Sequence, residues 1–374
     1  MIDKILLFPY YAVLKLRNGY YGKSGRKFYS PSVPSLCIGN VTAGGTGKTP
    51  MVELVLRMLR SSDEWMGKNI AVLSRGYKRE SKGFQQVVAD GAASMFGDEP
   101  LQIKKKFPWA TVAVDKNRVE GCELLLHPET LASGKKAKKC WYRDFPAADY
   151  IVLDDAFQYR KLRAAKTMVL VDYNRPVTED LLLPLGRLRD LPERIGEADV
   201  LVVTKCPAEL SGDERRAFAE RLGISGYSEA ACEGTGSGGK RQLVLFARIK
   251  YGQPEGVYEK TEARYVYSKK IILVSGIAKD TPLRDYLSDF YKIEKRFCFP
   301  DHHKYTWADI NKIRMALRKN PTASIMTTEK DAQRLLDFPG MPDEIAVRLF
   351  MVPIETEFLS EAERNAFKDC IESL

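Results

Sequence analysis

The chain has 374 residues, 44% of them apolar, and a formal net charge of +10. Its length and apolar content allow two hydrophobic cores, so we expect two domains. The seven cysteines are scattered and include no C-x-x-C pair, which argues against a disulfide framework or a zinc site and fits a reducing cytoplasm. The positive charge favours an anionic partner, which could be nucleic acid, an anionic membrane or a phosphorylated substrate.

The amino-terminal stretch, residues 1–30, combines an apolar segment at 2–16 with a basic flank that includes Arg17. It is too short, and too interrupted by charges and Pro9, to supply the roughly 20 apolar residues that span a bilayer. It also lacks a small-residue cleavage site, so it does not resemble a signal peptide. Two interpretations remain open: a helix that lies in the lipid interface, and a helix packed on its own domain.

Residues 39–50 read GNVTAGGTGKTP, between an extended apolar run at 33–38 and an amphipathic helical pattern. Strand, glycine turn and helix form the setting of a phosphate-binding loop, because glycines let successive N–H groups surround oxygens at the positive end of the helix. The expected nucleotide-binding residues are Thr42, Ala43, Gly44, Gly45, Thr46, Gly47, Lys48 and Thr49. Lys48 is expected to reach the outer phosphates and Thr49 to ligate Mg²⁺. The G-x-x-x-x-G-K-[ST] pattern expects glycine at position 42, and the alternative is a simple glycine turn closing a βα unit.

Short β-type runs alternate with helical patterns after this loop, at 70–74, 111–114, 150–153, 167–171 and 200–204. Continuous apolar strands separated by helices indicate a parallel sheet with helices on both faces. We therefore expect an α/β, P-loop NTPase-like domain over residues 31–227. Charged residues follow these strands and should share the carboxyl edge of the sheet, where ligands bind, with Lys48.

The composition changes at residues 228–268, where a glycine-rich turn precedes an alternating run at 243–251. This segment reads as a β-hairpin-like linker to a second, smaller α/β domain at 269–374. The sequence leaves open whether the segment after Pro353 stays in that domain. The lysine-rich run at 135–139 is expected to be a solvated loop.

Asp154 and Asp155 close the strand at 150–153, as in a Walker B element, where a carboxylate can hold the Mg²⁺ that bridges ATP phosphates. Asp98 and Glu99 precede a helix, and their simplest interpretation is an N-cap. His302 and His303 are adjacent, without a third metal ligand at a telling spacing.

The sequence TKCP at 204–207 ends a strand where guanine-specific P-loop proteins carry N/T-K-x-D. Pro207 has neither a carboxylate nor an N–H group with which to read guanine. This difference favours ATP over GTP.

Together with the phosphate loop, six further motifs resemble those of tetraacyldisaccharide 4'-kinases, the lipid A kinases of Gram-negative bacteria. In order they are Ser74–Tyr77, Gly97–Pro100, Leu153–Gln158, Pro184–Asp190, Asp301–His302 and Thr327–Ala332. The resemblance runs from the amino-terminal helix to the last strand. It departs from the family pattern at Ala156 and Tyr159, where glycine and histidine are usual, and at Asp190, where glutamate is usual.

The resemblance implies a two-domain kinase that moves the γ-phosphoryl group of ATP, with Mg²⁺, to the 4'-hydroxyl of a lipid-linked disaccharide 1-phosphate in lipid A biosynthesis. The enzyme would work at the cytoplasmic face of the bacterial inner membrane as a peripheral or monotopic protein. Its expected partners are that lipid substrate and the inner-membrane surface, with no nucleic acid and no second copy of the chain. This reading also favours the membrane interpretation of the amino-terminal helix, because the acyl chains of the acceptor stay in the bilayer.

The resemblance also implies catalytic and substrate-binding roles for residues whose function the local sequence does not show. Asp98 would accept the proton of the sugar hydroxyl, and His302 would orient it from the other domain, so that domain closure completes the site. Lys48 and Arg189 would neutralise charge on the transferred group. The expected substrate-binding residues are Arg75, Arg118 and Asp190.

Two competing functions are a membrane-associated P-loop NTPase switch and a basic nucleic-acid-binding module. A switch would hydrolyse nucleotide without an acceptor and would have no use for Asp98 paired with His302. A nucleic-acid-binding module lacks a recognisable recognition helix or aromatic RNA-binding motif in this sequence.

Overall fold

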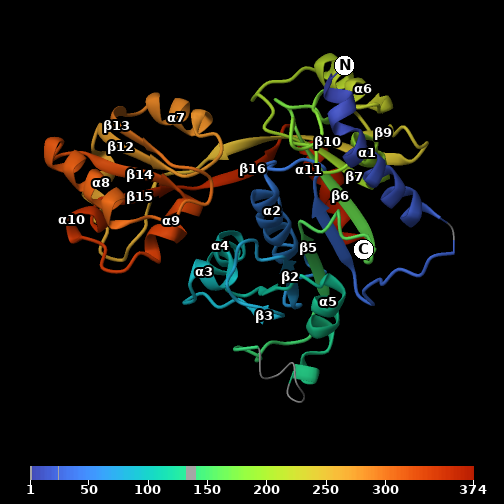
Figure 1. The fold of residues 1–374 in the computed structure, drawn as a ribbon, viewed down its shortest axis with the longest axis horizontal. Helices are drawn as coiled ribbons and strands as arrows, with labels where there is room; N and C mark the ends of the chain where they lie inside the picture. The colour runs from blue at the N-terminus through green and yellow to red at the C-terminus, as the bar shows by residue number, and fades with distance from the viewer. Residues whose placement is uncertain (1, 24, 132–139) are drawn as a thin grey trace.

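The computed structural model describes residues 2–23, 25–131 and 140–374, so the lysine-rich run at 135–139 lies outside the described residues. Two α/β units lie side by side and are joined by a narrow two-stranded connection (Figure 1). Each unit has its own sheet and hydrophobic core. The expected α/β class with a P-loop NTPase-like parallel sheet is confirmed.

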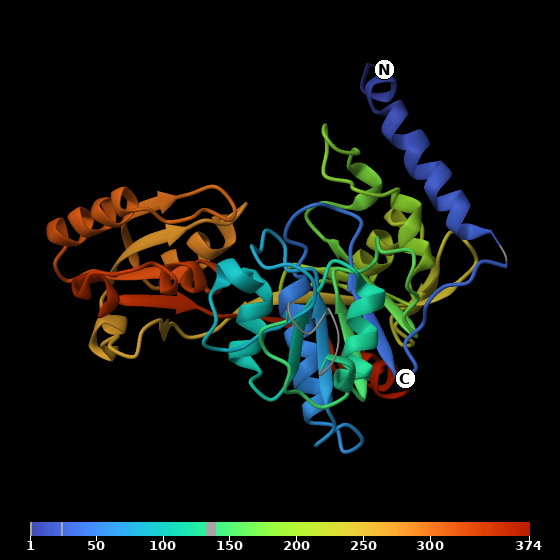
Figure 2. The same ribbon diagram turned by 60° about the horizontal axis from the view of Figure 1, so that its bottom comes forward.

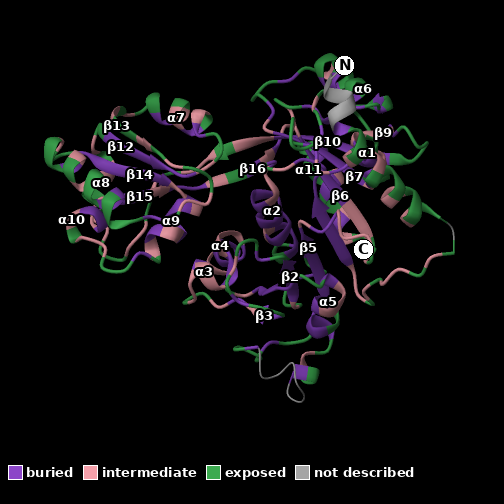
Figure 3. Cartoon of the chain, in the orientation of Figure 1, coloured by how far each residue is buried: buried purple, intermediate pink, exposed green. Residues whose placement is uncertain are grey.

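The larger unit is built on a sheet with the spatial order β3-β4-β2-β5-β1-β6-β7-β10-β9-β8. The strands from β4 to β10 run parallel to one another. Their bounds are β1 Ser35–Gly39, β2 Ile70–Ser74, β3 Gln85–Gln86, β4 Thr111–Val114, β5 Tyr150–Asp154, β6 Lys166–Asp172, β7 Val200–Thr204, β8 Ser225–Ser228, β9 Glu233–Thr235 and β10 Arg241–Tyr251. The central strands are buried along their whole length, because helices cover both faces (Figure 3).

Helices α2, α4 and α11 pack on one face of this sheet, and α1, α5 and α6 pack on the other. The α-helices of the larger unit are α1 Ile2–Gly22, α2 Lys48–Arg60, α3 Ala93–Phe96, α4 Asp98–Lys106, α5 Arg118–Leu126, α6 Gly212–Arg221 and α11 Glu361–Glu372. Short 3-10 helices lie at η1 Pro128–Leu131, η3 Val177–Glu179 and η4 Pro192–Glu197. Because α2 begins at Lys48 and α4 at Asp98, both helices present their first turn toward the site described below.

The smaller unit has a five-stranded sheet in the order β11-β15-β14-β12-β13, parallel except for β11. Its strands are β11 Glu255–Gly256, β12 Lys270–Ser275, β13 Lys292–Cys298, β14 Ser324–Thr328 and β15 Leu349–Val352. Its helices are η5 Ala263–Tyr267, α7 Thr281–Ser288, α8 Trp307–Lys319, α9 Glu329–Leu336 and α10 Asp343–Ala346. Helix α9 follows β14 directly and faces the larger unit (Figure 1).

The connection between the units corrects the expected linker. Strand β10 is the last parallel strand of the large sheet, and its far end pairs antiparallel with β16, Ile354–Phe358. A local hairpin is present within 228–268, formed by β9 and β10, but the ribbon that joins the units pairs β10 with β16, a segment about a hundred residues away in the sequence.

The carboxyl-terminal segment, whose placement the sequence left open, returns to the larger unit. After β16, helix α11 buries Phe367 and Ile371 in the core beside α2. The expected boundary of the second domain at residue 374 is thus wrong: that unit ends near Pro353.

Helix α1 lies along the outside of the larger unit, with the amino terminus projecting away from it (Figure 2). Leu7 and Leu14 are buried against the unit, whereas Phe8, Val13 and Leu16 are exposed. Within the described residues, no helix is long and apolar enough to cross a bilayer.

Candidate active site

The phosphate loop has the backbone geometry that the sequence predicts. Gly44 and Gly47 adopt positive φ values of 106° and 86°, which residues with a side chain rarely adopt. Gly47 is the N-cap of α2 and is not capped by a side chain. The loop therefore ends on the free N–H groups of a helix start, which is the arrangement that binds phosphate oxygens.

Side chains beneath the loop hold its shape. Asn40 donates a 2.7 Å hydrogen bond to the Thr46 hydroxyl, and Thr204, at the end of β7, donates to the Thr46 carbonyl oxygen at 2.9 Å. Lys205 donates to the Gly45 carbonyl oxygen at 2.5 Å. The loop is thus tied to the carboxyl ends of two strands, β1 and β7.

Lys48 and Arg189 meet at Asp155. The Lys48 ammonium lies 3.7 Å from Asp155 Oδ1, and Arg189 contacts both oxygens of that carboxylate, with one distance of 3.1 Å. Burial alone would raise the pKa of Asp155, but Lys48 and Arg189 outweigh it and lower the pKa to about 2. The carboxylate is therefore ionised and holds both cations beside the phosphate loop.

Asp154 has a different environment although it is the adjacent residue. Its Oδ2 accepts a 2.9 Å hydrogen bond from Ser74, while its Oδ1 is buried and has no hydrogen-bond partner among the described residues. Burial, together with the neighbouring charges of Glu99 and Asp155, raises the pKa of Asp154 to about 6. A buried carboxylate oxygen without a partner fits a site that is completed by a cation.

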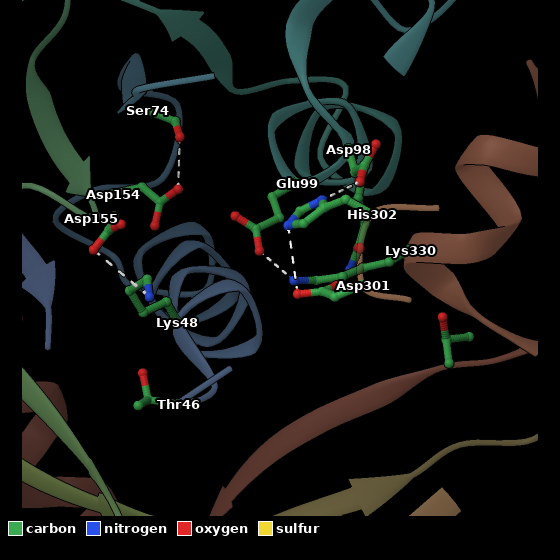
Figure 4. Close-up of polar contacts among 12 residues, drawn as sticks. Thr46, Lys48, Ser74, Asp98, Glu99, Asp154, Asp155, Asp301, His302 and Lys330 are labelled. Atoms are coloured by element: carbon green, nitrogen blue, oxygen red, sulfur yellow. Dashed lines mark hydrogen bonds and ion pairs between the residues drawn. The ribbon is translucent and has the colours of Figure 1, made fainter. Parts of the chain in front are cut away.

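The structure brings Asp98 together with two side chains of the smaller unit (Figure 4). His302 Nδ1 lies 3.2 Å from Asp98 Oδ2, and the Arg334 guanidinium donates to the same oxygen at 2.6 and 2.8 Å. Burial alone would raise the pKa of Asp98, but the contacts with His302 and Arg334 outweigh it and hold the pKa below its ordinary value. The N-cap interpretation of Asp98 does not hold, because Gly97 occupies the N-cap of α4 and no side chain caps it.

Glu99 lies between the Lys48–Asp155 pair of the phosphate-loop region and the Asp98–His302 pair (Figure 4). It forms an ion pair with Lys330, the second residue of α9, and the charge of Lys330 lowers the pKa of Glu99 despite burial. Lys48 acts in the same direction, which indicates that Glu99 lies within electrostatic range of the phosphate loop. The two units thus meet through charged side chains on α4 and α9.

The neighbouring histidine has a separate role. His303 Nε2 lies 2.9 Å from Asp309 Oδ2, at the start of α8 inside the smaller unit.

His302 has a left-handed backbone with φ of 60°, as does Asp155 with φ of 51°. Such conformations are uncommon for residues other than glycine and often occur at functional sites.

The expected substrate-binding residues are not equivalent. Arg75 is exposed at the end of β2. Arg118 is buried in the first turn of α5. Its guanidinium donates to the carbonyl oxygens of Asp115, at 2.5 Å, and Asp155, at 3.5 Å. It therefore holds the backbone at the carboxyl edge of the sheet.

Asp190 corrects the expectation most clearly, because it is fully buried rather than open to a substrate. Its carboxylate accepts hydrogen bonds from Arg17 at 2.8 Å and Asn18 at 3.0 Å, and it also contacts Arg194. We therefore assign Asp190 to anchoring α1 on the larger unit.

Sequence reasoning missed Arg334 altogether. It lies on α9, three residues after the Asp331 that it contacts at 2.8 Å. The only local signal is its position just beyond the Thr327–Ala332 motif, and nothing in that motif indicates a contact with Asp98, 236 residues away.

Comparisons with known proteins extend over almost the whole chain. A family model described as tetraacyldisaccharide-1-P 4'-kinase (LpxK) matches residues 4–373. The tetraacyldisaccharide 4'-kinase of Parabacteroides distasonis is 35% identical over 96% of this chain and 90% of its own length. That of Flavobacterium johnsoniae is 33% identical over 96% of this chain and 94% of its own.

One solved structure is similar to the whole fold. It is described as a crystal structure of the "apo" form of LpxK from Aquifex aeolicus in complex with ATP. The TM-score is 0.68, with coverage of 100% of this chain and 99% of that chain. The sequences are 23% identical, so this likeness concerns the fold.

Proposed function

We propose, from the premise that this chain belongs to the tetraacyldisaccharide-1-P 4'-kinase family, that it transfers the γ-phosphoryl group of ATP to the 4'-hydroxyl of a tetraacylated disaccharide 1-phosphate. The observation that carries the chemistry is the meeting of Asp98 with His302 of the other unit, near a phosphate loop that ends in Lys48. A nucleotide switch has no need for such a pair, whereas transfer to a sugar hydroxyl requires a group that accepts its proton.

The nucleotide half of the reaction belongs to residues 42–49. The N–H groups of the loop and the start of α2 would hold the phosphates. The Lys48 ammonium would stabilise the negative charge that develops on the transferred phosphoryl group. Arg189, held against Asp155 beside Lys48, can supply a second positive charge there. The nucleotide is proposed to be ATP because Pro207 replaces the guanine-reading Asp.

The residues also fit Mg²⁺, although no cluster of three or more metal-ligating side chains is preformed in the described part of the chain. Magnesium in kinases uses few protein ligands and several phosphate oxygens. Thr49 is buried at the start of α2, and Asp154 has a buried oxygen that no other described residue contacts by a hydrogen bond, so these two would hold the ion. Asp155 is the weaker candidate because Lys48 and Arg189 already occupy its oxygens. When held by these residues, Mg²⁺ would supply positive charge that neutralises the charge developing on the transferred phosphoryl group.

Proton transfer is proposed to run through the Asp98–His302 pair. Arg334 and His302 lower the pKa of Asp98, which makes the carboxylate alone a weak proton acceptor. The same carboxylate holds the imidazole by Nδ1 and would stabilise positive charge on it. His302 Nε2 lies 3.7 Å from Asp301 Oδ2, beyond hydrogen-bond distance, and can take a proton.

This arrangement favours His302 as the acceptor and Asp98 as the orienting group, the reverse of the roles expected from the sequence. The two groups still form one unit, whose protonation must be treated as that of a pair. Arg334 is a positioning residue, because it fixes the Asp98 oxygen that His302 uses.

The membrane part of the proposal rests on α1. Exposed apolar side chains on its outer side, such as Phe8 and Leu16, suit a helix in the lipid interface at the cytoplasmic face of the inner membrane. The acyl chains of the acceptor would then stay in the bilayer while its sugar enters the site.

The test is transfer from γ-labelled ATP to a tetraacylated disaccharide 1-phosphate in detergent micelles. The proposal predicts labelled lipid that appears only when the acceptor is present. Labelled inorganic phosphate as the sole product, at a rate independent of acceptor, would support a nucleotide switch instead.

A further inference from the structure

We infer that residues 180–189, named here the leucine loop, form a second lipid-contacting element that ties the bilayer surface to the phosphate loop. This inference rests on the proposed function, because only an acylated acceptor requires the site to work at a lipid surface. It concerns a surface separate from the exposed side of α1, to which the sequence already assigned a membrane role.

Three large apolar side chains of the leucine loop are exposed on its outer side. Leu181, Leu183 and Leu185 are 45%, 37% and 45% exposed, whereas Leu182 and Leu188 are buried at 7% and 1%. The loop is thus two-sided, with one row of leucines in the core and one row facing out. Exposed apolar groups that gather in this way mark contact surfaces.

Internal contacts hold the loop in this form. The Asp180 carboxylate accepts hydrogen bonds from the Leu181 and Arg187 N–H groups at 2.8 and 3.3 Å, and Arg175 neutralises it through contacts at 2.7 and 2.9 Å. A side chain at Gly186 would place a Cβ 2.1 Å from the Leu181 carbonyl oxygen, so only glycine fits there. The leucines are therefore presented by a folded loop whose one carboxylate, Asp180, is neutralised by Arg175.

The inner side of the loop is bonded to the phosphate loop. The Ala43 N–H donates to the Arg187 carbonyl oxygen at 2.6 Å, and the Arg189 N–H donates to the Val41 carbonyl oxygen at 2.9 Å. Thr42 and Leu188 form an antiparallel bridge between these two bonds. Any surface that holds the exposed leucines would therefore also hold residues 41–43 at a fixed distance from it.

The far end of the loop is bonded to α1. Tyr10 donates from its hydroxyl to the Arg189 carbonyl oxygen at 3.2 Å, and Arg17 and Asn18 bind the adjacent Asp190. From Leu7 onward, the exposed large apolar residues of α1 are Phe8, Tyr11, Val13, Leu16 and Tyr20. The leucine loop is thus anchored directly to the helix that carries the larger set of exposed apolar side chains.

These observations favour a lipid bilayer over a protein as the occupant. The exposed leucines belong to a loop that is bonded to an apolar helix with a cationic flank, a combination that suits anionic lipid. The acceptor enters from the same surface, and the loop backbone links that surface to the residues that hold ATP. A second copy of the chain remains the alternative that the test must exclude.

The test compares the wild-type enzyme with the triple variant L181S/L183S/L185S, which changes only side chains that are already exposed. Sedimentation with phosphatidylethanolamine–phosphatidylglycerol vesicles should show about tenfold weaker binding for the variant. The KM for the micellar acceptor should rise by a similar factor, whereas ATP binding to the free enzyme should not change. The matched control is Y267S/F290S, which removes two exposed aromatic side chains of the smaller unit and should bind vesicles as the wild type does.

Equal vesicle binding by the triple variant and the wild type would overturn the inference. So would a change in sedimentation velocity that shows the variant dissociating from a dimer, because the leucines would then cover a second copy. The vesicle measurement needs no catalysis, so a failure of phosphate transfer in the wild type would count against the proposed function and leave this inference to be judged separately.

Discussion

The two halves of the site are stabilised in opposite ways. The phosphate-loop half has its backbone in place, but its Asp154 is costly to ionise. This side chain is buried, its Oδ1 has no hydrogen-bond partner in the described part of the chain, and its pKa is raised to about 6. The acceptor half is paired in advance, since His302 and Arg334 hold the pKa of Asp98 below its ordinary value. The first half therefore has a buried carboxylate that no cation of the described residues contacts through Oδ1, whereas the second half is held together by the contact between the two units.

The largest expected effect comes from the phosphate-loop half. Lys48→Ala removes the ammonium beside Asp155 and should lower kcat/KM on the order of a thousandfold, with weaker ATP binding as well. Steady-state kinetics together with fluorescent-nucleotide titration measures both. Normal ATP affinity in this variant would show that Lys48 does not hold the phosphates.

The acceptor half should affect the chemistry without affecting nucleotide binding. His302→Ala should lower kcat by about a hundredfold or more, the usual contribution of a general base, at unchanged ATP affinity. His303→Ala is the matched control, because that side chain contacts Asp309 inside the smaller unit. If the His303 variant loses activity and the His302 variant keeps it, the assignment between the neighbours is wrong.

A smaller effect is expected for Arg334→Gln, which removes a cation from Asp98 but leaves the carboxylate buried. The pKa of Asp98 should then rise, so Asp98 becomes protonated at a higher pH and the acid limb of the kcat/KM profile moves to higher pH. The rate at neutral pH should fall about tenfold. Arg314→Gln is the control, since Arg314 pairs with Glu344 within the smaller unit. An acid limb that does not move would reduce Arg334 to a purely structural contact.

The comparison also predicts stability changes of opposite sign in the ligand-free enzyme. Because the folded-state pKa of Asp154 is raised, its ionisation opposes folding fully above about pH 6, and this cost disappears as the pH falls toward 4. Asp154→Asn should therefore raise Tm by a few degrees at pH 8 and much less at pH 4. Because the pKa of Asp98 is lowered, its ionisation favours folding at neutral pH and is lost on acidification, so Asp98→Asn should lower Tm at pH 8. Calorimetry that shows the same sign for both variants would contradict the comparison.

The difference between the halves also explains what the sequence could reveal. The phosphate loop and the strands at 70–74, 111–114 and 200–204 depend on local patterns, and the structure has those strands at the same residues. The alternating run at 243–251 and the motif around Asp98 are visible in the sequence, but nothing local shows that β10 pairs with β16 or that Asp98 contacts Arg334, because these partners are distant in the chain. Asp190 shows that a motif can be recognised while the role of one of its residues is misjudged. It is expected from the sequence to bind substrate, but its side chain is fully buried and pairs with Arg194.

The central claim is that Asp98 and His302, supplied by different units, act as one group on the sugar hydroxyl. The most direct measurement is a double-mutant cycle on single-turnover phosphate transfer with Asp98→Asn, His302→Ala and the combined variant. If the two residues act together, the combined variant should be little slower than the slower single variant. Rate losses that multiply in the combined variant would mean that the two side chains act independently, and would contradict the claim.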